Sequence, residues 1–323
     1  MILLLGATSY IGQAFARRLQ GRKDSFIPLS RKVFDYSRYE FLFDYIRKVK
    51  PDLVINAADC PETPNSPPGK LDRVTMLQTN SVLPQTISRV CQLTKTTFGH
   101  VSTGAIYSGA KVADKDGIQV IEDLGASVVR ELFAADPQKF LGFSESDTPN
   151  FSFNSPPCTF YSGTKALAEE ALKTAPAYVW RFQLPFDQQD DSQNLLSQIS
   201  EGLSLHDSIN SVSHLDDCVE ACLELWERNA PFGTYNVVNP GPVRTHEVVQ
   251  MMAACGKSRT PLRVLIYDEA APASERIAHL GCILDGSKLL RAGIKLRTAR
   301  SALQHTLQAW APQTSSSAVG VPS

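Results

Sequence analysis

The sequence has no excess of charge of either sign, no closely spaced cysteine pair and no long apolar run, and each absence argues against a class of protein. Its 323 residues carry 32 basic and 33 acidic side chains, so no overall positive field attracts nucleic acid or an anionic membrane. The seven cysteines include no CxxC pair, which favours reduced, buried thiols over a disulfide framework. No window approaches the roughly 18 apolar residues that cross a bilayer. We therefore expect a cytoplasmic protein that binds neither nucleic acid nor membrane and holds no metal.

The first residues already follow an α/β pattern. Met1–Leu5 is an apolar run too short for a signal peptide, and it reads as a buried strand. A turn of small residues, Gly6–Gly12, and an amphipathic segment, Gln13–Gln20, follow it. Because strands and helices keep alternating, we expect a Rossmann-type, doubly wound parallel sheet with helices on both faces. The further strands expected are Phe26–Leu29, Asp52–Ala57, Thr97–Ser102 and Tyr178–Phe182, and the helices are Tyr39–Val49, Val74–Leu93 and Tyr161–Leu172.

The pattern loosens near residue 187. We expect residues 1–186 to form mainly an NAD(P)-binding domain and 187–311 mainly a smaller α/β substrate lobe, with segments that interleave, while 312–323 form a frayed tail. The substrate cleft should lie between the two, because open α/β sheets bind ligands at the carboxyl ends of their strands. The segment Gly109–Asn154 shows little periodicity and is expected to be a loop-rich excursion. In the smaller lobe we expect helices at Ser192–Gly202 and Leu215–Arg228 and strands at Ile209–Val212 and Thr234–Val238.

The glycines of the first turn predict a dinucleotide-binding loop. Glycine lets the backbone turn sharply and approach a pyrophosphate at a helix N-terminus. Ser9 replaces the middle glycine of the usual GxGxxG motif, so an ordinary strand-to-helix turn remains the alternative. Small residues at the end of the third strand would let a cofactor pass close to the backbone. The expected cofactor contacts in these two segments are Gly6, Thr8, Ser9, Tyr10, Ile11, Gly12, Asn56, Ala57 and Ala58.

The second strand lacks the carboxylate that would hold an NAD ribose. Arg31 and Lys32 stand there instead. Two cations suit the 2′-phosphate of NADP(H), although a basic pair at this place also fits a solvated turn. We expect NADPH, with NADH as the alternative.

The strongest chemical signal is a tyrosine four residues before a lysine. On a helix, Tyr161 and Lys165 share one face, so the ammonium lies beside the phenol and favours the phenolate, bringing its pKa toward neutrality. Lys165 can also hold ribose hydroxyls. Thr103, at the end of the fourth strand, is placed to hydrogen-bond the substrate oxygen that Tyr161 protonates. These three are the expected catalytic residues, and Tyr161 and Lys165 are also expected cofactor contacts.

These motifs, with Val101–Tyr107 and Ser213–Asp217, resemble the extended short-chain dehydrogenases/reductases that act on sugar nucleotides. Three segments, Asp147–Phe151, Phe160–Ala166 and Tyr235–Gly241, are most similar to nucleotide-rhamnose synthases and, more loosely, to dTDP-4-dehydrorhamnose reductases. The synthases epimerise C3 and C5 of a nucleotide-diphospho-4-keto-6-deoxyglucose and then reduce C4. The resemblance implies a sugar-nucleotide substrate and allows a homodimer.

The sequence departs from the bifunctional synthases at the two residues that move protons on carbon. Where they carry a cysteine and a lysine, this chain aligns Ala105 and Gln198, neither of which can act as an acid or base. The resemblance therefore implies a 4-ketoreductase without 3,5-epimerase activity. Arg181 could face the cleft, but a buried structural pairing fits it equally well, and His214 is expected to pack the lobes together. The expected substrate contacts are Thr103, Gly104, Ala105, Arg181, Gln183 and Gln198.

Two other functions remain open. An NAD-dependent sugar-nucleotide epimerase or dehydratase would use the same Tyr161 and Lys165; Gly104-Ala105, in place of an acidic pair, argues against the dehydratase, and the basic pair after the second strand argues weakly against the epimerase. A non-catalytic regulatory subunit could keep the fold and the nucleotide, but such proteins tend to lose the tyrosine, lysine or threonine that this chain retains.

Overall fold

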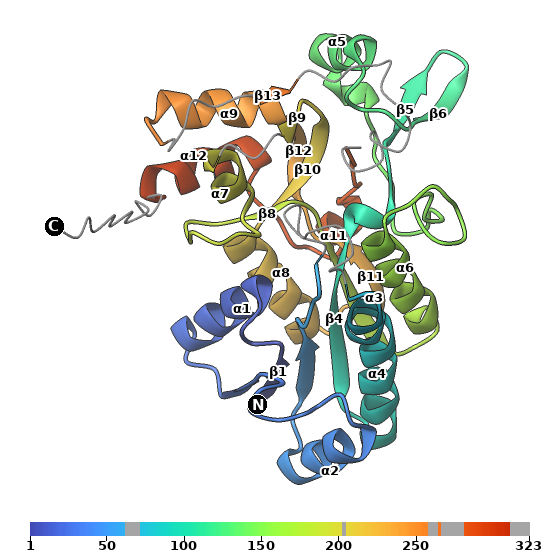
Figure 1. Ribbon diagram of the computed structural model, residues 1–323, viewed down its shortest axis with the longest axis vertical. Coiled ribbons are helices and arrows are strands. Elements are labelled where there is room, and N and C mark those ends of the chain that lie inside the picture. Colours follow the sequence, from blue (N-terminus) through green and yellow to red (C-terminus); the bar gives the residue numbers. More distant parts are fainter. Residues whose placement is uncertain (62–71, 202–204, 258–263, 266–280, 311–323) are drawn as a thin grey trace, which may run out of the picture.

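The computed structural model describes residues 1–61, 72–201, 205–257, 264–265 and 281–310. Its centre is a six-stranded sheet in which every neighbouring pair is parallel (Figure 1). This confirms the Rossmann-type α/β fold. The order across the sheet is β11 (Gly233–Asn236), β7 (Ala177–Phe182), β4 (Thr97–Thr103), β3 (Leu53–Asn56), β1 (Ile2–Leu5) and β2 (Phe26–Leu29).

Strand β1 is apolar throughout because both faces of the sheet are covered. Ile2 and Leu4 pack against one set of helices, and Leu3 and Leu5 against the other, each at most 3% exposed. Burying one such leucine contributes about 2 kcal/mol, so the strand anchors both layers. The first layer contains α1 (Tyr10–Gly21), α8 (Leu215–Glu227) and α11 (Ser287–Arg291); the second contains α2 (Tyr39–Val49), α4 (Leu83–Thr94) and the end of α6 (Phe160–Leu172).

The helix expected at Val74–Leu93 is interrupted. The chain forms α3 (Arg73–Leu77), a π-helical turn at Gln78–Val82 and then α4. Pro84 has no N–H to give to the carbonyl four residues earlier, so the regular α-helical ladder cannot continue through this turn. Leu83 donates instead to the carbonyl of Gln78, five residues back.

The smaller lobe has its own sheet and core. Strands β12 (Asn239–Arg244), β10 (Ile209–His214) and β8 (Pro185–Phe186) lie side by side beyond the large sheet (Figure 1). Trp310, wholly buried, belongs to the apolar cluster between this sheet and its helices. The other elements here are α7 (Leu195–Ser200), α9 (Thr245–Ala254), α12 (Ala299–Ala309) and the pair β9 (Leu205–His206) with β13 (Val264–Leu265).

The segment Gly109–Asn154, expected to be loop-rich, has more regular structure than its sequence indicates. It contains an antiparallel hairpin and a nine-residue helix. The second hairpin strand is mostly exposed, so no buried face imposes an alternating pattern on its sequence, and the helix buries only two side chains. Both therefore lack the periodicity that reveals an element. The elements of this segment are β5 (Ala110–Asp114), β6 (Gly117–Ile121), α5 (Ser127–Ala135) and a short 3₁₀ turn, Pro137–Lys139; another 3₁₀ turn, Gly104–Ile106, precedes the segment.

The chain crosses between the two units more than once. Strand β11 and helix α8 follow residue 187, yet they join the large sheet and its core. The domain boundary stays a prediction, and the tail 312–323 lies outside the described residues. Among the helices that the structure describes, none is both long and apolar enough to span a bilayer.

Candidate active site

The glycine loop is packed too tightly for side chains at two positions. Gly6 has φ of +76°, and a Cβ there would lie 2.3 Å from the backbone nitrogen of Ala58. A Cβ on Gly12 would lie 2.0 Å from the carbonyl oxygen of Gly6. Ser9, in the place of the missing glycine, accepts a hydrogen bond from the Gly12 N–H (3.0 Å) and donates one to the carbonyl of Ala57 (2.7 Å). It thereby caps α1 and ties the loop to the end of β3.

A cavity of about 340 Å³ opens between this loop, the carboxyl ends of β3, β4 and β7, and helix α7. This is the place where an open parallel sheet binds ligands. Within the described chain, Lys165 is the one cationic residue in the lining, and Asp59 and Glu201 are the acidic ones. The predicted site residues in the lining are Ser9, Ile11, Ala57, Ala58, Thr103, Ala105, Tyr161, Lys165, Gln183 and Gln198.

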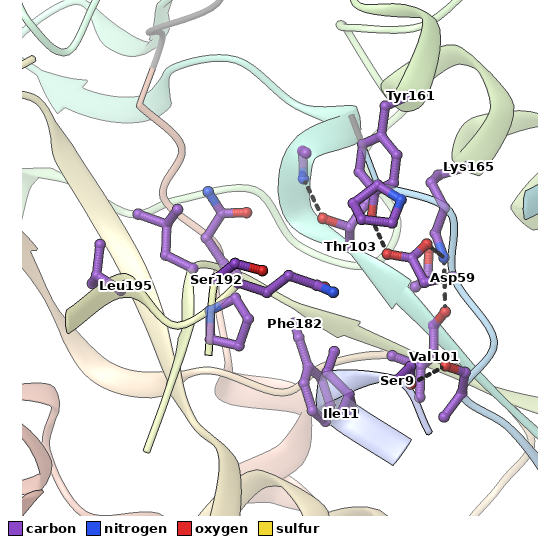
Figure 2. A pocket seen from close by; sticks show the side chains of 18 of the residues that line it. Ser9, Ile11, Asp59, Val101, Thr103, Tyr161, Lys165, Phe182, Ser192 and Leu195 are labelled. Atoms are coloured by element: carbon purple, nitrogen blue, oxygen red, sulfur yellow. Dashed lines mark hydrogen bonds and ion pairs between the residues drawn. The ribbon is translucent and has the colours of Figure 1, made fainter. Parts of the chain in front are cut away.

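The three expected catalytic side chains meet at one end of this cavity (Figure 2). Tyr161 and Lys165 lie on helix α6, whose N-terminus is capped by the side chain of Thr159. Lys165 is 2% exposed, and its Nζ donates to the carbonyl of Val101 (3.0 Å). Thr103 ends β4, and its Oγ1 accepts a hydrogen bond from the N–H of Ala105 (3.1 Å). A proton donor, a cation and a hydroxyl therefore share the same end of the cavity.

The expectation that the lysine brings the phenol's pKa toward neutrality is wrong for this geometry. Burial raises the pKa of Tyr161 well above its ordinary value, and the carboxylate of Asp59, which accepts a hydrogen bond from the phenol, raises it further. The nearby Thr103 hydroxyl opposes this shift. Tyr161 is thus protonated in this geometry, which is the form that a ketone reduction needs.

Asp59 is the site residue that sequence reasoning missed. Its Oδ2 lies 3.3 Å from the Tyr161 hydroxyl, and its Oδ1 lies 3.5 Å from Lys165 Nζ. A signal was present, because an acidic residue directly follows the small residues at the end of β3. Nothing local, however, indicates that the catalytic helix, a hundred residues later, supplies its partners.

Two predicted residues, Tyr10 and Asn56, point to internal partners and lie outside the cavity lining. The Tyr10 hydroxyl donates to buried Asp187 (2.8 Å). Asn56 is fully buried, with Nδ2 3.2 Å from Nδ1 of His100. Gly6, Thr8, Gly12 and Gly104 also lie outside the lining, the first three within the tightly packed loop.

Arg181, expected either to contact substrate or to form a buried pair, also lies outside the lining. It is 3% exposed, and its guanidinium meets the carboxylate of Glu169 through Nη2 (2.6 Å) and Nε (3.0 Å). Glu169 also accepts a hydrogen bond from Ser102 (2.6 Å). The pairing alternative fits this geometry, because a buried arginine needs its carboxylate.

Arg31 and Lys32 are exposed and follow β2 beside the glycine loop. The N–H groups of Gly6 and Ala7 both donate to the carbonyl of Leu29, which fixes this proximity. Arg31 Nη1 donates to Oγ1 of Thr79 (3.1 Å), a buried residue of the π-helical turn. Neither cation lines the cavity, and their role toward a 2′-phosphate stays a prediction.

His214 lies at the junction of the lobes, where packing was expected. It is 1% exposed, its Nδ1 contacts Asp217 (3.3 Å), and its ring lies 5.3 Å from that of Phe186. Its side chain accepts the N-capping hydrogen bond of α8.

Comparison with known proteins agrees with this geometry. Residues 1–311 match the family model described as the RmlD substrate binding domain. The chain belongs to this family. A relative from Arabidopsis thaliana, bifunctional dTDP-4-dehydrorhamnose 3,5-epimerase/dTDP-4-dehydrorhamnose reductase, is 28% identical over 254 residues, covering 77% of this chain and 73% of that protein.

Two solved structures share the fold of this RmlD-family chain. The L780 UDP-rhamnose synthase from Acanthamoeba polyphaga mimivirus superposes with a TM-score of 0.75 at 17% identity, covering 95% of this chain and 98% of that one. The dTDP-4-dehydrorhamnose reductase from Bacillus anthracis, solved with NADP, gives 0.69 at 15% identity, covering 95% and 97%. The extended short-chain dehydrogenase/reductase fold expected from the sequence is thereby confirmed.

Replacing Arg181 by methionine tests its structural role in this RmlD-family fold. The change keeps the side-chain length but leaves Glu169 as an unpaired buried charge, so the free energy of unfolding should fall by about 3–5 kcal/mol in urea titrations. The matched variant Arg291→Met, on an exposed arginine of α11, should change it by about 0.5 kcal/mol or less. Unchanged stability with a large rise in substrate KM would restore Arg181 as a substrate contact.

Proposed function

We propose that the protein uses NADPH to reduce the 4-keto group of a nucleotide-diphospho-4-keto-6-deoxy sugar, without epimerising C3 or C5. The observation that carries this proposal is the convergence of Thr103, Tyr161 and Lys165 at one end of a cavity beside the glycine loop. Membership of the RmlD substrate-binding domain family and the reductase named among its relatives support the same reaction. The cytoplasmic location and a homodimer stay predictions from the sequence.

The residues of the chain supply the proton chemistry of a ketone reduction. Tyr161 donates its proton to the carbonyl oxygen as the carbon receives a hydride, so C=O becomes CH–OH and the tyrosinate recovers a proton from solvent. The Thr103 hydroxyl stabilises the charge that develops on that oxygen. Lys165 would hold the ribose of the bound cofactor, and it keeps a positive charge beside the tyrosinate that forms.

The loop fits a dinucleotide. The close approach of Gly6 to the end of β3 leaves the N-terminus of α1 facing the cavity, where Ser9 and Ile11 form part of the lining. Ala57 and Ala58, which adjoin the loop, add little side-chain volume to the lining. NADPH bound there would supply the hydride, and the exposed Arg31 and Lys32 would form ion pairs with its 2′-phosphate.

The proposed absence of epimerisation depends on two neutral side chains. Ala105 and Gln198, which align with the cysteine and lysine of the bifunctional enzymes, both line the cavity. Gln198 donates a hydrogen bond to the carbonyl of Ser192 (2.9 Å), which orients its amide. Neither side chain can remove a proton from carbon or return one.

The first test mixes the protein with NADPH and UDP- or dTDP-4-keto-6-deoxyglucose in deuterated water. We expect stoichiometric oxidation of NADPH, followed by its absorbance, and a product whose NMR spectrum shows no deuterium at C3 or C5. Deuterium at those carbons would contradict the assignment of Ala105 and Gln198 and would direct attention to the carboxylates Asp59 and Glu201. No oxidation with either sugar would favour the epimerase or the regulatory subunit.

Replacing Tyr161 by phenylalanine removes the proton donor alone. Turnover should fall by about 10²- to 10⁴-fold, while NADPH affinity, measured by fluorescence titration, stays nearly unchanged. Tyr39→Phe, on the distant helix α2, provides the control and should keep full activity. Retained turnover in Tyr161→Phe would rule out the proposed donor.

Replacing Arg31 and Lys32 together by alanine tests the choice of cofactor. The loss of charge-assisted contacts with the 2′-phosphate should raise the Kd of NADPH by about tenfold or more and leave that of NADH within about twofold. Alanines at Arg47 and Lys48, at the end of α2, remove the same charge elsewhere and should alter neither. Equal losses for both cofactors would show that the pair is only a solvated turn.

A further inference from the structure

Asp59 is a carboxylate in direct contact with both partners of the catalytic pair. One of its oxygens accepts the phenol hydrogen of Tyr161 (3.3 Å), and the other faces the ammonium of Lys165 (3.5 Å), as Figure 2 shows. Its side chain is 20% exposed and that of the lysine 2%. The three groups therefore interact where solvent screens them weakly. A simple Tyr–Lys pair, in which the cation acts on the phenol alone, does not describe this site.

The backbone beside Asp59 is held by two hydrogen bonds to one side chain, that of Asn80. Asn80 accepts a hydrogen bond from the N–H of Cys60 (2.9 Å) and donates one to the Cys60 carbonyl (3.0 Å). The same amide reaches Thr164 on the catalytic helix (3.3 Å). Asn80 lies in the π-helical turn, so the irregularity beside Pro84 sets the position of the segment that carries the carboxylate. The contact between Asp59 and Tyr161 is thus held by the fold.

A carboxylate in this position opposes the usual action of the lysine. An ammonium beside a phenol favours the phenolate, whereas a carboxylate that accepts the phenol hydrogen favours the protonated form and also offsets the lysine's charge. We propose that Asp59 is a positioning residue that keeps Tyr161 protonated, so that the enzyme reduces its substrate over a range of pH extending well into the alkaline. This inference rests on the proposed function only where activity is measured.

The other charged and titratable groups around the phenol come from several elements. Cys60 follows Asp59, Lys165 lies one turn along α6, and Glu201, at the end of α7, lines the same cavity. His100, on β4 and fully buried, has its pKa lowered well below the ordinary value by burial and by the ammonium of Lys165, so it stays neutral. Asp59 is the acidic residue that meets the phenol by a hydrogen bond.

The direct test follows the ionisation of one phenol without any substrate. Protein labelled with ¹³C at tyrosine Cζ is titrated by NMR, and the Tyr161 signal is assigned by its loss in Tyr161→Phe. Asp59→Asn should lower the pKa of Tyr161 by about one unit or more, because the ammonium is then unopposed. Asp59→Ala should also lower the pKa of Tyr161. Agreement between the two variants shows that the shift does not come from a folding defect of Asp59→Asn. Glu170→Gln, which removes the same charge from the exposed side of α6, should leave it unchanged.

The second test measures reduction against pH. Reduction needs the protonated phenol, so activity is lost as pH rises through the pKa of Tyr161, and the alkaline limb of kcat/KM should move to lower pH by the same one unit or more in both Asp59 variants. Asp59→Glu should move it back toward the wild-type position. The proposal is overturned if the alkaline limb of kcat/KM does not shift, or if the pKa of Tyr161 in Asp59→Asn equals that in the wild type. If no 4-keto sugar nucleotide is reduced even by the wild type, the proposed function fails, while the NMR titration still decides the role of Asp59.

Discussion

The arrangement of the site depends on one buried ion pair beneath the catalytic helix. Tyr161, Lys165 and Glu169 follow one another at four-residue spacing, so they share a face of α6 that lies against the sheet. Glu169 is held by Arg181 of β7 and by Ser102 of β4, two strands that pair directly. The helix is thereby fixed along its axis relative to the carboxyl edge of the sheet. With this anchor in place, the phenol and the ammonium reach the end of β4.

Much of the fold could be predicted from the sequence because its central strands are buried on both faces. Such strands appear as unbroken apolar runs, as in Met1–Leu5, and the helices between them keep a regular apolar stripe. The hairpin at Ala110–Ile121 and the helix Ser127–Ala135 escaped prediction because they bury few side chains. The π-helical turn escaped for another reason: the proline that causes it also fits the first turn of an ordinary helix.

The site was predictable where its chemistry is local in sequence. The glycine loop and the Tyr161–Lys165 spacing are each contained within a few residues, and the structure brings both to one cavity. Orientation was not predictable, because it depends on distant partners. Tyr10 turns to Asp187, and Asn56 turns to His100. A residue type that suits a ligand equally suits such an internal partner, and only the fold selects between them.

The raised pKa of Tyr161 and the neutral side chains Ala105 and Gln198 in the same cavity are both consistent with reduction. An epimerase must exchange protons with carbon repeatedly, so it needs groups that both accept and return a proton near neutral pH. A ketoreductase needs a single proton, delivered to oxygen as the hydride arrives. In the proposed function, Ala105 and Gln198 of this cavity stand at the places of the acid and base of the bifunctional synthases, and Asp59 keeps the proton on Tyr161. On this proposal, two side chains that cannot move protons on carbon and a carboxylate that keeps a proton on the phenol both favour reduction. The same carboxylate also limits the lysine's influence, so Lys165 acts here more through its contacts than by acidifying the phenol.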